Sequence, residues 1–256
     1  MSTAASKPAS LANATADRAI DILLLFTEQA PVWTAQDIAL HFDMPRSTTY
    51  RYLSSLRSHA LIVQDSRGRY TLGPRLLHMS QVARAVHPVV AVALPHMREL
   101  LDRFKENVVL NERIGTEIIG LERLQSPQQI VLKSSRTHLL PWPATGSAKV
   151  LLAFAPEAEQ AELMAALVPT AYTANTLPNL KALTQHLKQV SAQGHAESDE
   201  ERDEGVWGAS VPLVGPSGCH HALSLVGPKF RIPAAVRAQM VKALLAAGQT
   251  ISAQLR

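Results

Sequence analysis

Residues 34–57 read TAQDIALHFDMPRSTTYRYLSSLR, and this stretch predicts two short helices separated by a tight break. The hydroxyl of Thr34 can accept a hydrogen bond from the backbone N–H of Asp37, whose carboxylate can return the bond, so the first helix begins there. Pro45 separates the two helices, because the residue before a proline is pushed out of the helical region and proline itself suits an opening turn. This pattern is typical of a helix-turn-helix.

The second helix has the composition of a DNA recognition helix. We expect Tyr50, Leu53 and Leu56 to form its inward stripe, since they are spaced by three residues. Arginine can bind guanine or phosphate, and hydroxyl groups can bind base edges or phosphates. The candidate DNA-binding side chains of this helix are Arg46, Ser47, Thr48, Thr49, Arg51 and Tyr52.

A basic hairpin follows the two helices. Residues 61–65 and 69–72 have strand-like composition and flank a short turn, which places Arg67 and Arg69 at its tip. Between residues 44 and 84 there are seven arginines and one acid, Asp65. Two amphipathic helices in an ordinary helical core are the alternative, but the hairpin and the charge favour a winged helix-turn-helix that binds double-stranded DNA.

Composition indicates an ordinary globular protein. The chain has 256 residues, of which 46% are hydrophobic and 18% charged, enough for two domains with cores. Cys219 is the sole cysteine, which excludes an internal disulfide. The sequence has no stretch with the pattern of a signal peptide or a membrane span, so we expect a cytoplasmic protein with no membrane partner. No motif calls for a cofactor.

The patterns predict four segments and an α+β fold. We expect a disordered arm at 1–14, the winged helix-turn-helix at 15–73, a linker helix at 74–87 and a second domain at 88–256. The first helix is predicted at 17–29 with Ile20, Leu23, Leu24 and Phe26 inward. In the second domain, strand-like runs, including one at 130–133, predict an antiparallel sheet flanked by helices.

Three clusters in the second domain are candidate sites. Thr145, Gly146 and Ser147 at a predicted helix start could bind an anion such as a carboxylate, or could be a plain cap. The run 199–204 could be a metal or acid/base cluster, but contiguous charges favour a solvated loop. Cys219-His220-His221 could suggest zinc or a thiol nucleophile; adjacent strand residues alternate faces, and nothing pairs them with His138 or His195, so we favour a structural role and expect no metal site.

With these residues in view, the chain resembles the IclR family of bacterial transcriptional regulators over about residues 15–254. The resemblance rests on RAIDIL (18–23), PRSTTYRYL (45–53), YTLG (70–73), ATGSAK (144–149), Gly194, DEERD (199–203), Gly205 and ASVP (209–212). It implies a winged helix joined by the linker helix to a GAF-like effector domain. Members are dimers or tetramers, and bind small organic or aromatic acids.

The resemblance also implies a pocket. By position it would involve Gly146, Ser147, Ser198, Gly208, Ser210 and Ser224, to which the helix start adds Thr145. The sequence departs from the family pattern at Gly208, where many members have cysteine, at Ala60, where glycine is common, and at Val226, where some have a small polar residue. The first and third departures imply a pocket of different shape and lower polarity.

Three functions fit these patterns. The favoured one is a regulator that binds a pseudo-palindromic operator as a homodimer or dimer of dimers and responds to a small carboxylate effector. An enzyme acting on a small acid is the second, and the lack of a convergent nucleophile and base in the sequence argues against it. A DNA binder without sequence preference is the third. Leu76, Met79 and Val82 of the linker helix are the predicted dimer contacts.

Overall fold

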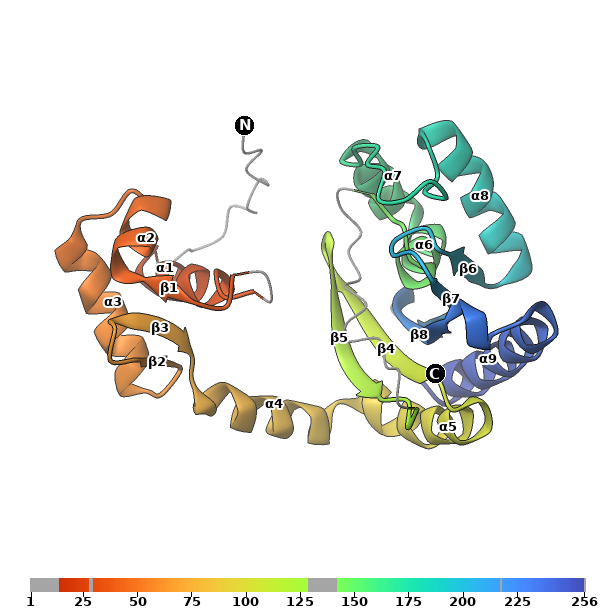
Figure 1. Cartoon of the computed structure of the whole chain (residues 1–256), viewed down its shortest axis with the longest axis horizontal. Coiled ribbons are helices and arrows are strands. Elements are labelled where there is room, and N and C mark those ends of the chain that lie inside the picture. Colours follow the sequence, from red (N-terminus) through yellow and green to blue (C-terminus); the bar gives the residue numbers. More distant parts are fainter. Residues whose placement is uncertain (1–13, 28–29, 129–141, 217, 256) are drawn as a thin grey trace. The chain divides into compact units, whose positions relative to one another are not determined.

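The computed structural model describes residues 14–27, 30–128, 142–216 and 218–255 (Figure 1). The chain divides into two compact units, residues 1–84 and 85–256. Residues 1–13 of the predicted arm at 1–14, the strand predicted at 130–133 and His138 lie outside the described residues, and residue 14 is the start of α1. Within the described ranges, no helix has the length and apolar character needed to cross a membrane.

The N-terminal unit is a winged helix-turn-helix, as predicted. Its elements are α1 (Ala14–Leu24), β1 (Trp33–Thr34), α2 (Ala35–His41), α3 (Arg46–Ser58), β2 (Ile62–Gln64) and β3 (Arg69–Leu72). The strands form an antiparallel sheet in the order β1-β3-β2. Thr34 and Asp37 make the predicted capping box, with the Thr34 hydroxyl accepting from the Asp37 N–H at 3.2 Å. The core includes Ile22, Ile38, Leu53 and Ile62.

The buried faces of α1 and α3 differ from the faces predicted from the sequence. α1 ends at Leu24 rather than residue 29, and Ile22 is buried while Ile20 and Leu24 are exposed. In α3 the inward stripe is Thr49, Leu53 and Leu56, not Tyr50, Leu53 and Leu56. The spacing of four and then three residues suits a helix slightly better than three and three, so Thr49 takes the inner position and Tyr50 is 54% exposed.

Among the described residues of the second unit, five antiparallel strands form a sheet of order β5-β4-β8-β7-β6. The strands are β4 (Asn107–Ile114), β5 (Glu117–Leu124), β6 (Ala196–Asp199), β7 (Val206–Gly215) and β8 (Gly218–Pro228). The helices are α4 (Pro74–Val86), α5 (Pro88–Phe104), α6 (Gly146–Ala153), α7 (Glu157–Ala165), α8 (Leu180–Gln193) and α9 (Ala234–Gln254), with a short 3-10 turn, η1 (Lys229–Arg231). α4 begins before the unit boundary, covers most of the stretch predicted as a linker helix, and buries none of its residues.

Helices cover both faces of this sheet (Figure 1). α5 and α9 pack on one face, where alternate strand residues such as Leu110, Leu223 and Leu225 join their core. α6, α7 and α8 form a second core with Ala222 and Cys219. Because successive side chains of a strand point to opposite faces, β4 and β8 serve both layers at once. Val109 and Ser224 therefore face the α6 side, and this side holds the cavity described below.

Candidate functional site

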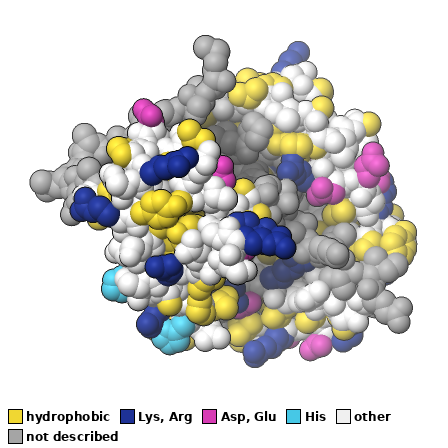
Figure 2. Space-filling view, turned by 60° about the vertical axis from the view of Figure 1, so that its left-hand side comes forward, with side chains coloured by type: hydrophobic (Ala, Val, Ile, Leu, Met, Phe, Trp, Pro, Cys, Tyr) yellow, Lys and Arg dark blue, Asp and Glu magenta, His cyan; other side chains and the backbone are white. Residues whose placement is uncertain are grey.

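The recognition helix α3 presents three of its predicted DNA-binding side chains to solvent. Arg46, Ser47 and Arg51 are exposed, and Thr48 is partly exposed. Arg46 donates from Nη2 to Gln36 Oε1 at 3.2 Å, which directs its guanidinium along the helix-turn-helix surface. Figure 2, in which the N-terminal unit comes forward, shows several Lys and Arg side chains and few acidic ones on that face. This surface suits phosphate and base contacts.

Two predicted DNA-binding residues are positioned differently from expectation. Thr49 is fully buried and its hydroxyl donates to the Pro45 carbonyl at 3.2 Å, so its assignment as a DNA-binding residue was wrong. Tyr52 is partly buried and packs against the core of the unit. Thr49 therefore holds the start of α3 together instead of facing outward. Tyr50 is exposed in its place.

The wing is organised by one acid. The Asp65 carboxylate accepts from the backbone N–H groups of Arg67 and Arg69, both at 2.9 Å, and from Arg69 Nε at 2.8 Å. The Arg69 backbone bond is the main reason that the pKa of Asp65 lies below its usual range. Arg67 is exposed at the tip. Among the described residues, the Arg67 side chain forms no ion pair, whereas Arg69 Nη2 lies 2.8 Å from Asp65 Oδ2.

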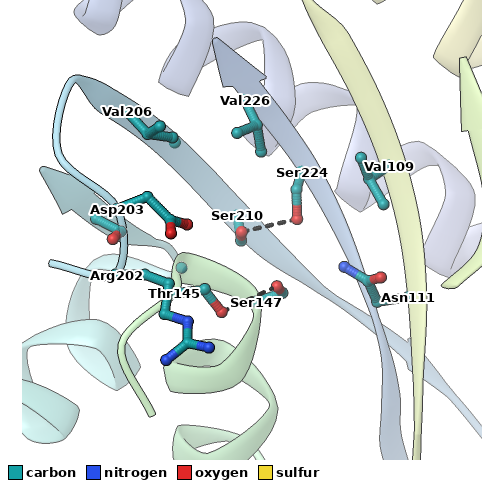
Figure 3. A pocket seen from close by; sticks show the side chains of 13 residues that line it. Val109, Asn111, Thr145, Ser147, Arg202, Asp203, Val206, Ser210, Ser224 and Val226 are labelled. Atoms are coloured by element: carbon teal, nitrogen blue, oxygen red, sulfur yellow. Dashed lines mark hydrogen bonds between the residues drawn. The ribbon is translucent and has the colours of Figure 1, made fainter. Parts of the chain in front are cut away.

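A cavity of about 40 Å³ lies between the N-terminus of α6 and strands β4, β6, β7 and β8 (Figure 3). All seven residues predicted for the effector pocket line it: Thr145, Gly146, Ser147, Ser198, Gly208, Ser210 and Ser224. Several other lining residues were not predicted: Val109, Asn111, Arg202, Asp203 and Val206. They could not be placed from the sequence, because β4 and the loop after β6 reach the cavity only through the sheet topology. Val226, noted as a departure, is also in the lining.

The start of α6 packs tightly on the strands. Thr145 is the N-cap residue, and its hydroxyl accepts from the Ala148 N–H at 3.2 Å. A Cβ on Gly146 would lie 2.7 Å from Ser210 Oγ and 3.0 Å from the Ala196 carbonyl oxygen, so only glycine fits there. The first N–H groups of a helix have no partner within the helix and carry partial positive charge. Here that end of the helix faces the cavity.

The serines around the cavity have distinct partners. Ser210 and Ser224, on neighbouring strands, lie with their Oγ atoms 2.8 Å apart. Ser198 donates to the Ala144 carbonyl at 2.9 Å and so holds the segment before α6 against β6. Gly208 leaves room for Val226, because a Cβ at Gly208 would lie 3.3 Å from Val226 Cγ2. Hydroxyl groups and apolar side chains therefore share the lining, as they do in most ligand sites.

The acidic run 199–204 is the predicted solvated loop only in part, since Asp203 and Glu204 are exposed whereas its first carboxylates are paired. Asp199 contacts Lys229 at 2.9 Å and Arg237 at 2.8 Å, and Glu200 pairs with Lys229 as well. Asp199 and Glu200 share Lys229 of η1, and Asp199 also pairs with Arg237 of α9, which contiguous charges in a sequence cannot reveal. The loop that carries Arg202 and Asp203 to the cavity is thus fixed at its base.

Glu201, in the same run, pairs with a buried lysine of α6. Lys149, in the middle of α6, is fully buried and donates to Glu201 Oε1 at 2.5 Å and to the Glu197 carbonyl at 2.6 Å. Burial lowers the pKa of Lys149 and raises that of Glu201, and their mutual attraction opposes both shifts. This pair connects α6 directly to the loop that bears Arg202 and Asp203.

The cysteine and histidine run forms no site by itself. Burial raises the pKa of Cys219 to about 12, which makes its thiol a poor nucleophile at neutral pH. The Nδ1 atom of His220 lies 3.5 Å from Arg113 Nη2, whereas His221 lies near Glu112 on the neighbouring strand. His195 pairs with Glu197 instead. The prediction that these residues do not converge on one another is consistent with these positions.

Each of the two units matches a model of a known protein family. The IclR helix-turn-helix domain model matches residues 15–66, and the model of the bacterial transcriptional regulator IclR C-terminal domain matches residues 81–253. The chain is 31% identical over 241 residues to the HTH-type transcriptional regulator XynR of Escherichia coli K12, which covers 93% of this chain and 96% of the relative.

Solved structures share the fold. An IclR transcriptional regulator from Alicyclobacillus acidocaldarius superposes with a TM-score of 0.84 at 22% identity, covering 96% of this chain and all of that one. An IclR homolog from Microbacterium hydrocarbonoxydans, crystallised in complex with 4-hydroxybenzoate, has a TM-score of 0.77 at 24% identity and covers 94% and 99% of the two chains. With a family model matching more than half of its length, the chain belongs to the IclR family of bacterial transcriptional regulators.

Proposed function

We propose that this regulator binds operator DNA through α3 and the wing, and that a small carboxylate-bearing effector in the α6 cavity changes that binding. The observation that carries the second part is the position of the α6 N-terminus, whose residues Thr145, Gly146 and Ser147 line a cavity together with other hydroxyl groups and valines. A helix N-terminus favours an anion, and Gly146 allows close approach to the backbone. The relative crystallised with 4-hydroxybenzoate supports an acid of this kind.

The charged groups around the cavity limit the kinds of effector that can bind there. Asp203 also lines it, and Figure 3 shows its carboxylate directed inward from the loop above α6. A carboxylate ligand would be repelled by Asp203 if it lay beside it and attracted by α6 if it lay at the helix end. A molecule with a carboxylate at one end and a hydroxyl donor at the other satisfies both groups. We therefore favour hydroxy acids over simple carboxylic acids.

The size of the cavity places a further condition on binding. A volume of about 40 Å³ holds roughly three water molecules. A benzoate-sized acid needs more space, so its binding requires lining side chains to move. Arg202 and Asp203 are the side chains that we expect to move, because both lie on a surface loop. The Arg202 guanidinium stacks on Tyr172, with its carbon 3.9 Å from the centre of the ring.

A dimer is the form in which we expect DNA binding. α4 buries none of its own residues, and Met79, Val82 and Val86, which share one face of the helix, are 52%, 53% and 74% exposed. Leu76, one of the three predicted contacts, is partly buried instead. An exposed apolar helix face fits a second copy of the chain, and two recognition helices related by a two-fold axis would read half-sites about 34 Å apart, or a multiple of that.

The effector proposal is tested by thermal unfolding and by operator binding in the presence of matched ligands. 4-Hydroxybenzoate should raise the melting temperature of the full chain and shift the operator affinity, whereas 4-hydroxybenzamide, which lacks the charge, should do neither. Ser147→Ala should weaken the response, while Ser191→Ala, which removes a hydroxyl of α8 outside the cavity, should leave it unchanged. A response equal for acid and amide would exclude the helix end as the carboxylate site.

A space-filling substitution at Gly146 is a poor test of this site. Its missing Cβ would already touch Ser210 Oγ and the Ala196 carbonyl, so a larger side chain would displace α6 whether or not a ligand binds. Asp203→Asn is better, because Asp203 is exposed and its removal disturbs little packing. If Asp203 accepts from the effector hydroxyl, this variant should lose discrimination between 4-hydroxybenzoate and benzoate.

A further inference from the structure

A cluster outside the effector cavity brings two histidines and a glutamate together. His87 is the residue between α4 and α5, Glu112 lies on β4 and His221 lies on β8, directly opposite Glu112 in the strand register. His87 Nε2 is 3.8 Å from Glu112 Oε2, and His221 Nε2 is 3.4 Å from Glu112 Oε1. One nitrogen or oxygen atom of each residue lies within 4.8 Å of the other two.

The spacing of the cluster is too long for direct hydrogen bonds and suitable for an ion. A nitrogen–oxygen hydrogen bond spans 2.7–3.2 Å, and both histidine–carboxylate separations exceed this range. Ligand atoms around a tetrahedral ion with bonds of 2.0–2.1 Å lie about 3.4 Å apart. Side-chain rotations that move the ligand atoms by roughly 1 Å would therefore bring all three groups to coordination distance.

One ring nitrogen of each histidine in this cluster lacks a hydrogen-bond partner. His87 Nδ1 and His221 Nε2 are buried and make no hydrogen bond within the described part of the chain. Buried polar atoms normally have a partner, and His221 Nε2, the nitrogen that faces Glu112, therefore points to a missing group.

From this geometry we propose that His87, Glu112 and His221 bind one divalent transition-metal ion, with Zn²⁺ as the ion that the ligand set fits. Two imidazoles and one carboxylate are ligands that zinc accepts, and the same set also suits ferrous iron, cobalt and nickel. The side chains are 29%, 24% and 16% exposed, so an ion bound there keeps a position open to water. Ca²⁺ and Mg²⁺ are disfavoured because they prefer oxygen ligands.

The site is separate from the effector cavity. Asn111 and Ser224 line that cavity from the α6 face of the sheet, whereas Leu110 and Leu223 contact the α5 and α9 core on the other face. By the alternation of strand residues, Glu112 and His221 belong with the second set. His87 follows α4 directly, so the ion would fix the residue that joins α4 to the effector unit. Sequence reasoning missed this pairing because His87 lies 134 positions from His221.

The test is metal binding by the untagged full-length chain after treatment with a chelator. Titration with Zn²⁺ against a chromophoric chelator should give one equivalent per chain, and Co²⁺ should give visible d–d absorption of a site with nitrogen and oxygen ligands. His87→Ala, Glu112→Gln and His221→Ala should each lower the Zn²⁺ affinity at least about tenfold. His220→Ala is the matched control, since it removes the neighbouring histidine on the same strand, and it should bind Zn²⁺ as the wild type does.

A second readout guards against variants that misfold. Zn²⁺ should raise the melting temperature of the wild type and of His220→Ala, and should not raise that of the three ligand variants. His87→Ala decides the question if the strand variants fold poorly, because the His87 side chain makes no cap hydrogen bond to α5. The proposal is overturned if the wild type takes up no stoichiometric Zn²⁺, or if His87→Ala and a folded strand variant retain wild-type affinity.

Discussion

At the scale of single residues, Ala60 has a backbone conformation that glycine adopts more easily. It follows α3 with a φ of 56°, in the left-handed region that costs an L-residue roughly 1–2 kcal/mol. The sequence has alanine where glycine is common in the family. This strain belongs to the turn that sends the chain from α3 into β2, where the Leu61 N–H donates to the Leu56 carbonyl at 3.0 Å.

Ala60→Gly should therefore stabilise the N-terminal unit by about 0.5–1 kcal/mol, since relief of the strain exceeds the added freedom of the unfolded chain. Urea unfolding followed by the signal of this unit measures the change. His59→Gly is the control, because His59 has a φ of −93° and should gain nothing. A lower midpoint for Ala60→Gly would contradict this account of the turn.

His186 makes the stability of the second unit depend on pH. Its pKa is lowered from 6.5 to about 4, first by burial and then by the nearby charge of Lys149, whose partner Glu201 shares the same region. The folded-state pKa lies below the unfolded value, so between pH 6.5 and 4 the unfolded chain binds a proton that the folded chain does not. The stability contributed by the neutral imidazole is thus present above pH 6.5 and lost as the pH falls.

We expect the wild type to lose more unfolding free energy between pH 7 and pH 5 than His186→Gln loses. Comparing the two proteins cancels the shifts of Glu201 and of other carboxylates, which both share. Denaturant unfolding at the two pH values is the measurement. Equal losses would mean that His186 titrates normally in the folded protein.

At the scale of elements, α3 and the wing should contribute to DNA binding in different ways. Arg46→Ala or Arg51→Ala should cost about 1–3 kcal/mol at the cognate site and relax base preference at one position, if these side chains read bases. Arg67→Ala should weaken binding to all sequences and reduce the salt slope by about one. Arg69→Ala should have a smaller effect on DNA than Arg67→Ala, because Asp65 already pairs with it.

Fluorescence anisotropy with specific and scrambled operator fragments, at several salt concentrations, separates these effects. Thr49→Val is the internal control, since its buried hydroxyl bonds only to the Pro45 carbonyl among the described residues and should not alter base preference. Wild-type affinity of both Arg46→Ala and Arg51→Ala for the cognate site would refute the assignment of α3 as the reading helix.

Most elements were predictable because local signals mark their ends. The Thr34 capping box, Pro45 between helices and Gly218 at the β7–β8 turn each fix a boundary in the chain itself. It was harder to predict which face of each helix is buried. Thr49 and Tyr50 are neighbours, and only the packing of the whole unit decides which of them is buried. The strand β6 was missed because its charged residues resemble a loop until Arg237 and Lys229 pair with Asp199.

The candidate cavity was predictable in part for a similar reason. Small and hydroxyl residues next to a helix start already indicate an anion site, and family resemblance added the serines of β6, β7 and β8. Arg202 and Asp203 were hidden in the acidic run. Their position depends on the Lys149–Glu201 pair, which joins residues 52 positions apart in the sequence. Contacts over such distances leave no periodic signal.

At the scale of the whole molecule, the exposed face of α4 should control assembly. Val82→Glu places a charge on the proposed contact and should shift the protein toward monomers and weaken operator binding, because a buried unpaired charge is costly. Gln81→Glu adds the same charge at the adjacent position of α4 and should change neither property. Sedimentation equilibrium measures the first effect, and a monomeric wild type that binds its operator would refute the proposed dimer.

The burial of Cys219 has a practical consequence for spectroscopy. It is the single cysteine of the chain, and we expect its thiol to react little with alkylating reagents, because it is buried and burial raises its pKa. The native chain therefore serves as its own background for maleimide chemistry, with no cysteine to remove first. A cysteine introduced at an exposed site such as Ser54 would carry a fluorophore or spin label at one defined position. The motions of the recognition helix on DNA can then be followed in otherwise unaltered protein.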